Sequence, residues 1–430
     1  MVYYIRDPIH GFIEIDEWEK KIINQLAFQR LRRIKQLSLS NMVYPATNHT
    51  RFEHSLGVMH VATQMFDNIV TRERDFLMRE FGYDEASLKR ERTIVRLASL
   101  LHDVGHSPFS HAGEELMPIK TIKQDGKPEY YQHEDYSIAI IKNMFKECID
   151  NDFKHNKLRI TVDEICDLLD KKPSSSKKVF WRNLISGQLD ADRADYLLRD
   201  SYYAGVNYGK YDLQRILRTL TVIKAPETED LLIGIDRRGW HAAEGLIIAR
   251  YQMFTQVYFQ HTRRAYDHHI TEAMKTLLKK EYGKGNFPKP DTKKNIQEYL
   301  NWDDWKVEGL IKMGEAGNHG EIILNRTHFR RVYETSEVPS IEELDEFESV
   351  YSTFRDEIGF TDCAEKSWYK TGDEDIPIVD ENKTVKPLSL YSNLIKNFAP
   401  VRQMRIYAPY ETKDNIKKEI DDFRRKKRHG

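Results

Sequence analysis

The chain has 430 residues, and at about 150 residues per domain this length predicts two or three domains. Its hydrophobic content of 40% is sufficient for a sizeable core, and its charged content of 31% indicates an extensive solvated surface or helices with many ion pairs. Because 67 basic and 68 acidic residues leave a formal net charge of -1, the chain as a whole is not committed electrostatically to nucleic acid or to a membrane surface.

The cysteine content argues against a disulfide-stabilised protein. Cys148, Cys166 and Cys363 are odd in number and include no CxxC pair, so neither a disulfide framework nor a cysteine-based zinc site is expected. Residues 1–7 lack the pattern of a signal peptide, and no apolar run reaches the roughly 20 residues that a membrane helix needs. We therefore expect a soluble, cytoplasmic protein that has no membrane partner.

Helical periodicity dominates about the first 280 residues. Apolar residues recur near helical spacing in segments 22–37, 56–70 and 94–101, and Gly105 and Pro108 end the last of these helices just after His102 and Asp103. Residues 161–164 match a capping box ahead of a further helix. Residues 253–278 are expected to form one long helix.

Later segments predict mixed structure. Two β-rich runs on either side of Pro226, within residues 219–236, predict a hairpin, and residues 283–293 have the Gly, Pro and Lys content of a linker. Beyond it we expect a helix near 339–357, strands near 375–379 and 403–408, and a last helix near 412–428. The predicted fold is mainly α, with a helical domain at 1–283 that includes a short β-hairpin and a smaller α+β region at 284–430.

Three segments carry candidate chemistry: RFEHSLGV at 51–58, LLHDVGHSPFSH at 100–111 and QLDADRADYLLRD at 188–200. Adjacent His and Asp side chains diverge by about 100° on a continuing helix, but where the helix stops both can reach one ion. Imidazole and carboxylate ligands suit several divalent metals, and a site that keeps coordination positions open is typical of catalysis. Such an ion acidifies water and polarises a phosphoryl oxygen.

Each of these residues also has an ordinary structural interpretation. A lone histidine on a helix is more often a core or surface residue than a ligand, and Asp192 alone could start a helix or form an ion pair. The joint pattern is much less probable by chance, because three separate segments agree in order and context.

The three segments resemble the HD superfamily of metal-dependent phosphohydrolases, whose motif is H…HD…D. The closer resemblance is to the deoxynucleoside triphosphate triphosphohydrolases, which include bacterial enzymes and the animal sterile-alpha-motif and HD-domain protein. It is carried by DPIHGFIEI at 7–15, FQRLRRIKQL at 28–37, RFEHSLGV, HDVGHSPFSH, the ADYLLRD run and HTRRAYDHH at 261–269. The resemblance fades beyond about residue 285, and it implies an HD-domain helical bundle.

The resemblance implies a metal centre and a set of pocket histidines. The implied metal ligands are His54, His102, Asp103 and Asp192. His106, His111 and His133 would lie near the scissile phosphate, with Glu114 as an acidic partner where the animal enzyme has Asp. The metal could be Mn, Fe, Mg, Zn or Ni, and Mg would accompany the nucleotide.

The same resemblance implies a deoxynucleotide pocket. Arg51 would contact phosphate, for which a guanidinium fork is well shaped. Gln36 and Leu37 would line the sugar, with Gln36 near the 3′-hydroxyl and too little room for a 2′-hydroxyl. The remaining triphosphate, sugar and base contacts would come from Arg193, Tyr196, Asp200 and Tyr266.

An activating nucleotide site between subunits is a further implication. Gln29 and Arg32 match that stretch of the animal enzyme, whereas Asn24 and Tyr3 depart from its Asp and Lys, which weakens the expectation of guanine-specific activation. The basic residues of segment 30–35 have a second interpretation as a solvated helix face. The family implies a homo-oligomer, either a tetramer or a dimer of dimers.

The predicted function is hydrolysis of dNTPs to deoxynucleoside and inorganic triphosphate. The alternatives are another HD-type nucleotidase or phosphodiesterase, and a non-catalytic binder of nucleotide or single-stranded nucleic acid. The basic run at 424–428 is the main feature that favours nucleic acid, but such a run more often stabilises a helix C-terminus. Nucleic acid is therefore not the favoured partner.

Overall fold

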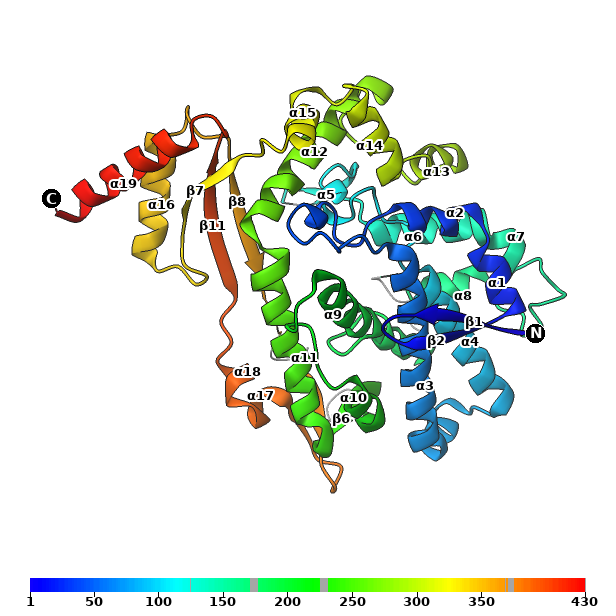
Figure 1. Cartoon of the computed structure of the whole chain (residues 1–430). Coiled ribbons are helices and arrows are strands. Elements are labelled where there is room, and N and C mark those ends of the chain that lie inside the picture. The colour runs from blue at the N-terminus through cyan, green and yellow to red at the C-terminus, as the bar shows by residue number, and fades with distance from the viewer. Residues whose placement is uncertain (124, 171–176, 225–230, 368, 370–374, 430) are drawn as a thin grey trace.

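The computed structural model describes residues 1–123, 125–170, 177–224, 231–367, 369 and 375–429. The fold is mainly α, as predicted (Figure 1). The helices up to the predicted boundary are α1 (Glu17–Ile23), α2 (Leu26–Gln29), α3 (Arg51–Phe81), α4 (Glu85–Leu101), α5 (His111–Glu114), α6 (His133–Ile140), α7 (Lys146–Ile149), α8 (Val162–Asp167), α9 (Ala191–Ala204), α10 (Leu213–Thr219), α11 (Trp240–Met253) and α12 (His261–Tyr282). Those that follow are α13 (Lys293–Leu300), α14 (Asp304–Lys312), α15 (Gly317–Asn325), α16 (Ile341–Thr353), α17 (Leu388–Tyr391), α18 (Asn393–Lys396) and α19 (Lys413–His429).

The N-terminal residues form an antiparallel hairpin of β1 (Val2–Asp7) and β2 (Gly11–Asp16). The helical spacing over residues 22–37 does not produce one helix. α1 ends at Asn24, α2 is a single turn, and residues 30–33 form a 3₁₀ turn. Leu26, which the periodicity places among the apolar positions, is 88% exposed.

Helices α3 and α4 pack against each other and form the centre of the main core. Capping boxes start both helices: Thr50 with Glu53 for α3, and Asp84 with Ser87 for α4. The capping box predicted at residues 161–164 also starts a helix, α8. Helices α4 and α9 both pack against α3. The N-termini of α3 and α9 and the C-terminus of α4 come together in the interior of the bundle.

The predicted long helix at residues 253–278 is wrong. The chain forms α11, a π-helical turn at Phe254–Tyr258 and then α12. Gln260 has an extended ψ of 125°, and its side chain caps the new helix by accepting a hydrogen bond from Arg263 N at 2.8 Å. An amphipathic pattern continues through such a break, because the apolar residues on both sides face the same core.

The predicted hairpin is present as β5 (Leu220–Lys224) and β6 (Leu231–Asp236), while Pro226 lies outside the described residues. The hairpin is part of a four-stranded sheet in the order β10-β9-β6-β5, in which β9 (Pro377–Val379) runs parallel to β6 and β10 (Val385–Pro387) forms the edge. A small two-stranded ribbon, β3 (Ile119–Ile122) with β4 (Pro128–Tyr130), projects beside α6.

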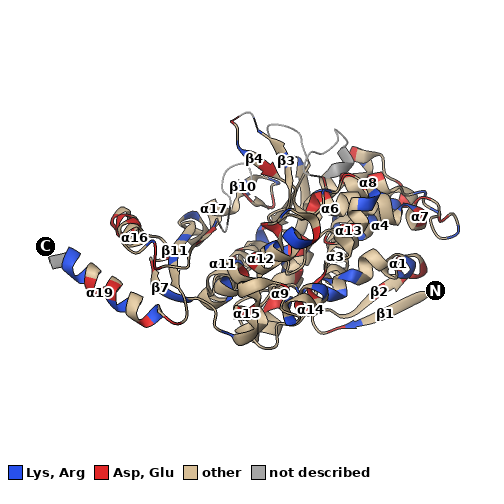
Figure 2. Ribbon diagram, turned by 90° about the horizontal axis from the view of Figure 1, so that it is seen from above, with Lys and Arg blue, Asp and Glu red and all other residues tan. Residues whose placement is uncertain are grey.

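The C-terminal α+β region is confirmed. Strands β7 (Arg330–Glu334), β11 (Val401–Ala408) and β8 (Phe360–Lys366) form a sheet in that order, and α16 and α19 pack with it around a second, smaller core. Figure 2 shows acidic residues, in red, along the ribbon of α16. Glu346 of α16 forms an ion pair with Arg424 of α19. Helix α19 matches the predicted last helix.

Residues within and just after the predicted linker pack into the main core. Phe287, Ile296, Tyr299 and Trp302 are all buried there, and α15 lies along α12. A domain boundary at residue 283 remains a prediction. Among the described helices, none combines the length and apolar character that crossing a membrane requires.

A buried ion pair ties α4 to the N-terminal segment. Arg96 on α4 donates to the Glu19 carboxylate at 2.6 and 2.8 Å, and also to Thr63 Oγ1 and the Glu14 carbonyl. Removing one member of such a pair leaves a buried charge without compensation and typically costs about 3–5 kcal/mol.

We predict that Arg96→Met lowers the free energy of unfolding by roughly 3–5 kcal/mol, measured by urea denaturation followed by tryptophan fluorescence. The matched control is Arg92→Met on the same helix, because the Arg92–Asp67 pair is about half exposed and should contribute about 1 kcal/mol or less. Equal losses in the two variants would contradict this account of the Arg96 pair.

Candidate functional site

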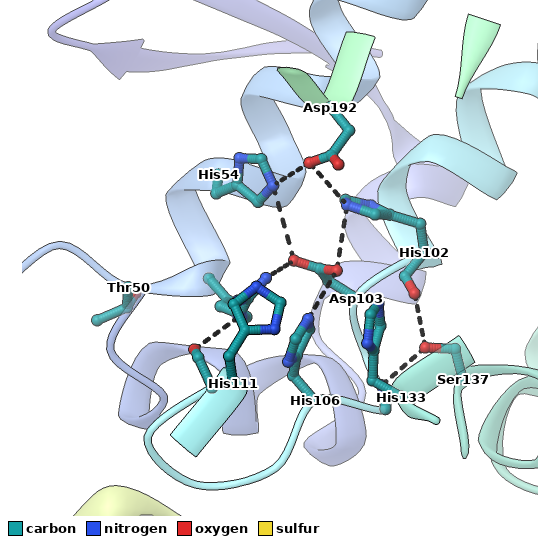
Figure 3. A network of polar contacts seen from close by, with 12 residues as sticks. Thr50, His54, His102, Asp103, His106, His111, His133, Ser137 and Asp192 are labelled. Carbon is teal, nitrogen blue, oxygen red and sulfur yellow. Dashed lines mark hydrogen bonds and ion pairs between the residues drawn. The ribbon is translucent and has the colours of Figure 1, made fainter. Parts of the chain in front are cut away.

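Four side chains that can bind a metal, two histidines and two aspartates, converge where three helix ends meet. His54 lies in the first turn of α3, His102 caps the C-terminus of α4 with Asp103 directly after it, and Asp192 lies in the first turn of α9. His54 Nε2 lies 3.0 Å from Asp192 Oδ1 and 3.7 Å from Asp103 Oδ2. His102 Nε2 lies 3.2 Å from Asp103 Oδ1 and 3.8 Å from Asp192 Oδ1 (Figure 3).

This group fits a divalent metal ion. Nε2 of His102 is buried and has no hydrogen-bond partner among the described residues, although it points at two carboxylates. Burial would raise the pKa of Asp103, but Arg51, His102 and His54 together hold it below its usual range, so the carboxylate is charged. Two imidazoles with two carboxylates form a nitrogen and oxygen donor set typical of catalytic metal sites.

The chain after α4 is held tightly in place. A Cβ on Gly105 would lie 2.3 Å from the backbone oxygen of His133, so only glycine permits this approach of the loop to α6. Ser137 Oγ accepts from Gly105 N at 3.0 Å and donates to the His102 carbonyl at 2.6 Å. These contacts fix the point at which His102 and Asp103 leave the helix.

Three further histidines surround Glu114 beside the metal-binding group. His106 and His133 stack with ring centroids 3.9 Å apart. Glu114 accepts from Nδ1 of His133 in a short hydrogen bond and faces His111 Nδ1 at 2.8 Å. Burial lowers the pKa of His106 well below its usual value, whereas at His133 the lowering by burial is outweighed by Glu114, which raises the pKa to about 9. Burial therefore favours the neutral form of His106, whereas Glu114 favours the protonated form of His133.

Arg51 is oriented by a strained loop. Its Nε donates to Ser110 Oγ at 2.8 Å, and its Nη1 donates to Asp103 Oδ2 at 2.5 Å. Phe109 and Ser110 have φ values of 56° and 54°, a region that costs free energy in residues other than glycine. Strain of this kind persists only where the surroundings enforce it, here through the Ser110 bonds to Arg51 and to the Lys35 carbonyl.

Most of these residues line a cleft of about 450 Å³, whereas His54 and Glu114 lie outside its lining. Most of the predicted site residues are brought together there: the lining includes Gln36, Leu37, Arg51, His102, Asp103, His106, His111, His133, Asp192, Arg193, Tyr196 and Asp200. Tyr266 is not brought to the cleft, because its side chain is fully buried and packs against His328 with ring centroids 4.4 Å apart.

Several cleft residues were not identified from the sequence. Arg250 comes from α11, Arg263 and Arg264 come from α12, and Glu365 and Lys366 come from β8 of the C-terminal region. An arginine inside the apolar run GLIIARYQMF was a usable signal for Arg250. Nothing in the sequence indicated that a strand beginning 78 residues after the end of α12 would reach this cleft.

The basic segment at residues 30–35 differs from a solvated helix face. Arg30 is 1% exposed and donates to the carbonyls of Trp302 and His106, so it stabilises the interior beside the site. Arg32 is exposed and bonds Gln29, which makes this pair the accessible part of the predicted nucleotide-activator site. The activator site itself remains a prediction.

A second histidine group, His268, His269 and His319, lies away from the cleft on α12 and α15. Nε2 of His269 accepts from Phe329 N at 3.1 Å, so its proton lies on Nδ1, which faces Nδ1 of His319 at 2.9 Å. Neither facing atom is then available to a metal, and this group is best explained as a structural hydrogen-bond chain.

Comparisons with known proteins agree with this geometry. The family model "HD domain" matches residues 51–200, and the model "HD associated region" matches residues 211–358. The chain is 32% identical to the uncharacterized protein MJ1154 of Methanocaldococcus jannaschii, covering 97% of this chain and 84% of that protein. It is 26% identical to the deoxynucleoside triphosphate triphosphohydrolase SAMHD1 homolog of Dictyostelium discoideum, covering 96% of this chain and 73% of that protein.

Two solved structures share the fold. A hypothetical protein from Aquifex aeolicus matches 98% of this chain and all of its own with a TM-score of 0.77 and 30% identity. A phosphohydrolase from Bacteroides thetaiotaomicron matches 95% of this chain and all of its own with a TM-score of 0.71 and 25% identity. The chain belongs to the HD-domain phosphohydrolase family, whose HD domains are metal-dependent.

Proposed function

We propose that the protein hydrolyses dNTPs at the α-phosphorus and releases a deoxynucleoside and inorganic triphosphate. The observation that carries the proposal is that three of the four metal-binding side chains, the stacked histidines, Gln36, Leu37 and several arginines line one cleft. The similarity to a deoxynucleoside triphosphate triphosphohydrolase over most of the chain supports the same substrate class. Nucleotide activation and assembly into a tetramer or a dimer of dimers are further predictions from this relationship.

The metal would be held by His54, His102, Asp103 and Asp192. When bound, a divalent ion supplies a Lewis acid that polarises a phosphoryl oxygen and acidifies water. The side chain of Asp192 is 37% exposed, whereas His54 and Asp103 are almost fully buried, so the group is open only on the side of the cleft. That opening is where a phosphate can approach.

The histidines would supply the proton that the departing 5′-oxygen takes up. Glu114 accepts from Nδ1 of His133 and thereby fixes the orientation of that ring, whose cation can donate a proton to the departing 5′-oxygen. The low pKa of His106 favours its neutral form, and His106 Nε2 lies 3.5 Å from Asp103 Oδ1.

The arginines would bind the polyphosphate. Arg193, Arg250, Arg263 and Arg264 enter the cleft from α9, α11 and α12. Guanidinium groups form short, charge-assisted and often paired hydrogen bonds with phosphate oxygens. A long, highly charged polyphosphate such as the triphosphate of a dNTP therefore suits this cleft better than a single phosphate.

Gln36 would recognise the sugar. Its side chain is 7% exposed and lines the cleft, and its Oε1 has no hydrogen-bond partner in the described part of the chain. A buried amide oxygen of this kind is costly until a donor reaches it, and the 3′-hydroxyl of a deoxyribose can be that donor. Leu37, beside it, provides an apolar wall against a 2′-hydroxyl.

There are two alternative functions. Another HD-type nucleotidase or phosphodiesterase would share the metal group but release different products. A non-catalytic binder of nucleotide or single-stranded nucleic acid is less favoured, because the donor set and the pocket histidines are all present and converge.

The first prediction concerns the products. The protein incubated with each dNTP and Mn²⁺ or Mg²⁺ should release triphosphate and deoxynucleoside in equal amounts, resolved by ion-exchange chromatography. Chelation of the metal by EDTA should abolish the reaction. Release of pyrophosphate or single phosphate would instead support the nucleotidase alternative.

The second prediction concerns His133. We expect His133→Gln to lower kcat by about 10²- to 10⁴-fold, the usual contribution of a general acid. The control is His241→Gln, because the His241 side chain is 75% exposed and does not line the cleft. A kcat within a factor of about two of the wild type would exclude His133 as the proton donor.

The third prediction concerns the sugar. Gln36→Ala removes one neutral hydrogen bond and should lower kcat/KM on dATP by roughly 3- to 10-fold, with a much smaller change in any hydrolysis of ATP. Gln25→Ala is the control, since the Gln25 side chain donates to the Lys21 carbonyl of the preceding helix α1 and does not line the cleft. Equal wild-type rates on ATP and dATP would remove the basis for the deoxynucleotide assignment.

A further inference from the structure

A buried network lies behind His54, on the side away from the cleft. His54 Nδ1 is 2.8 Å from Oδ2 of Asp195, which follows Asp192 by three residues on α9. The side chains of both His54 and Asp195 are 0% exposed. A carboxylate only accepts hydrogen bonds, so the proton of His54 lies on Nδ1 and the Nε2 lone pair faces the metal-binding group.

Asp195 also contacts Arg199 and His10. Arg199 donates to both of its oxygens, from Nε to Oδ2 and from Nη2 to Oδ1, each at 2.8 Å. His10 Nε2 lies 2.6 Å from Oδ1. With His54, these contacts occupy about four acceptor positions, which is the full capacity of a carboxylate.

The network extends into the N-terminal hairpin. Arg199 Nη1 donates to Asp7 Oδ2 at 2.8 Å, and the other Asp7 oxygen accepts from the backbone of Ile9 and His10, each at 2.9 Å. The turn between β1 and β2 is therefore folded by Asp7 and presents His10 to Asp195. Segment 7–11 thus contacts the carboxylate that orients a metal-ligand candidate, although it does not line the cleft.

Helix α3 leaves room for this network at one position. A Cβ built on Gly57 would lie 1.9 Å from Asp195 Oδ1 and 2.5 Å from Arg199 Nη2. Any side chain there would displace the carboxylate or the guanidinium. The glycine lies three residues after His54, so the same helix carries the imidazole and the space for its carboxylate partner.

We propose that Asp195 is a positioning residue that fixes the tautomer and orientation of His54 for metal binding, and that the N-terminal hairpin completes this network through His10. The inference rests on the metal site of the proposed function. It assigns to Asp195, Arg199, His10 and Gly57 a role in metal affinity that is distinct from contact with substrate.

The test measures metal binding by the full-length protein, stripped with a chelator and titrated with Mn²⁺ while free Mn²⁺ is followed by electron paramagnetic resonance. Asp195→Asn keeps the shape of the side chain but places an NH₂ group against Arg199. We expect it to weaken Mn²⁺ binding by about 10- to 100-fold, the usual effect of losing such a partner. Gly57→Ala should also weaken Mn²⁺ binding. The matched control is Gly245→Ala on α11, where no atom lies within 4 Å of the new Cβ, and it should leave Mn²⁺ binding unchanged.

A pair of variants at His10 separates positioning from general stability. His10→Leu removes the donor to Asp195 and should weaken Mn²⁺ binding, while His10→Gln retains an N–H donor and should restore much of the affinity. The melting temperatures of the metal-stripped proteins measure the stability of the fold independently of metal binding. If Asp195→Asn and His10→Leu lower the melting temperature but leave the Mn²⁺ affinity unchanged, the network only stabilises the fold. The inference is then overturned.

The metal site itself is checked with Asp103→Asn. If wild type and Asp103→Asn bind Mn²⁺ equally, or wild type does not bind it, the proposed metal site fails and the inference fails with it. If wild type binds more tightly than Asp103→Asn, but Asp195→Asn, Gly57→Ala and His10→Leu all match wild type, the metal site stands and only the positioning role is wrong.

Discussion

The meeting of three helix ends is the constraint on which the rest of the site depends. The N-termini of α3 and α9 and the C-terminus of α4 point into the same small volume. The partial negative charge at the end of α4 favours a cation there, and the partial positive charges at the starts of α3 and α9 favour an anion such as phosphate. The backbone therefore contributes to binding both partners of a metal-dependent phosphohydrolase before any side chain is considered.

Holding that geometry requires close packing that tolerates little variation. Gly105 lets the loop after α4 approach α6, and Gly57 lets α3 approach the side chains of α9. Ser110 adopts a strained backbone conformation so that its hydroxyl reaches Arg51. These positions have no direct chemistry, yet each sets the place of a group that does. A small error at such a position is expected to reduce activity, because catalytic groups must be held within a fraction of an ångström.

The charge of the cleft is local and is not visible in the composition. The net charge of the chain is -1, whereas the cleft gathers arginines from α3, α9, α11 and α12. The expectation that the family resemblance fades beyond about residue 285 is wrong, because the HD associated region matches residues 211–358 and MJ1154 matches 97% of the chain. The C-terminal region adds Glu365 and Lys366 from β8 to the cleft. The second region thus helps to shape the cleft of the first, which offers a physical reason for the two to occur together in one chain.

The sequence by itself determined the mainly helical class, the position of the helix that stops at His102 and Asp103, and the four side chains that converge. The helical class and the helix end depend on local signals, namely periodicity, capping residues and helix breakers, whereas the four converging side chains are what the resemblance to the HD superfamily implies. Only the tertiary structure decided that Arg30 is internal, that Tyr266 packs away from the cleft, and that Asp195 supports His54. Each of these depends on which distant segment lies opposite, such as Trp302 for Arg30 or the N-terminal hairpin for Asp195, and no local pattern contains that information.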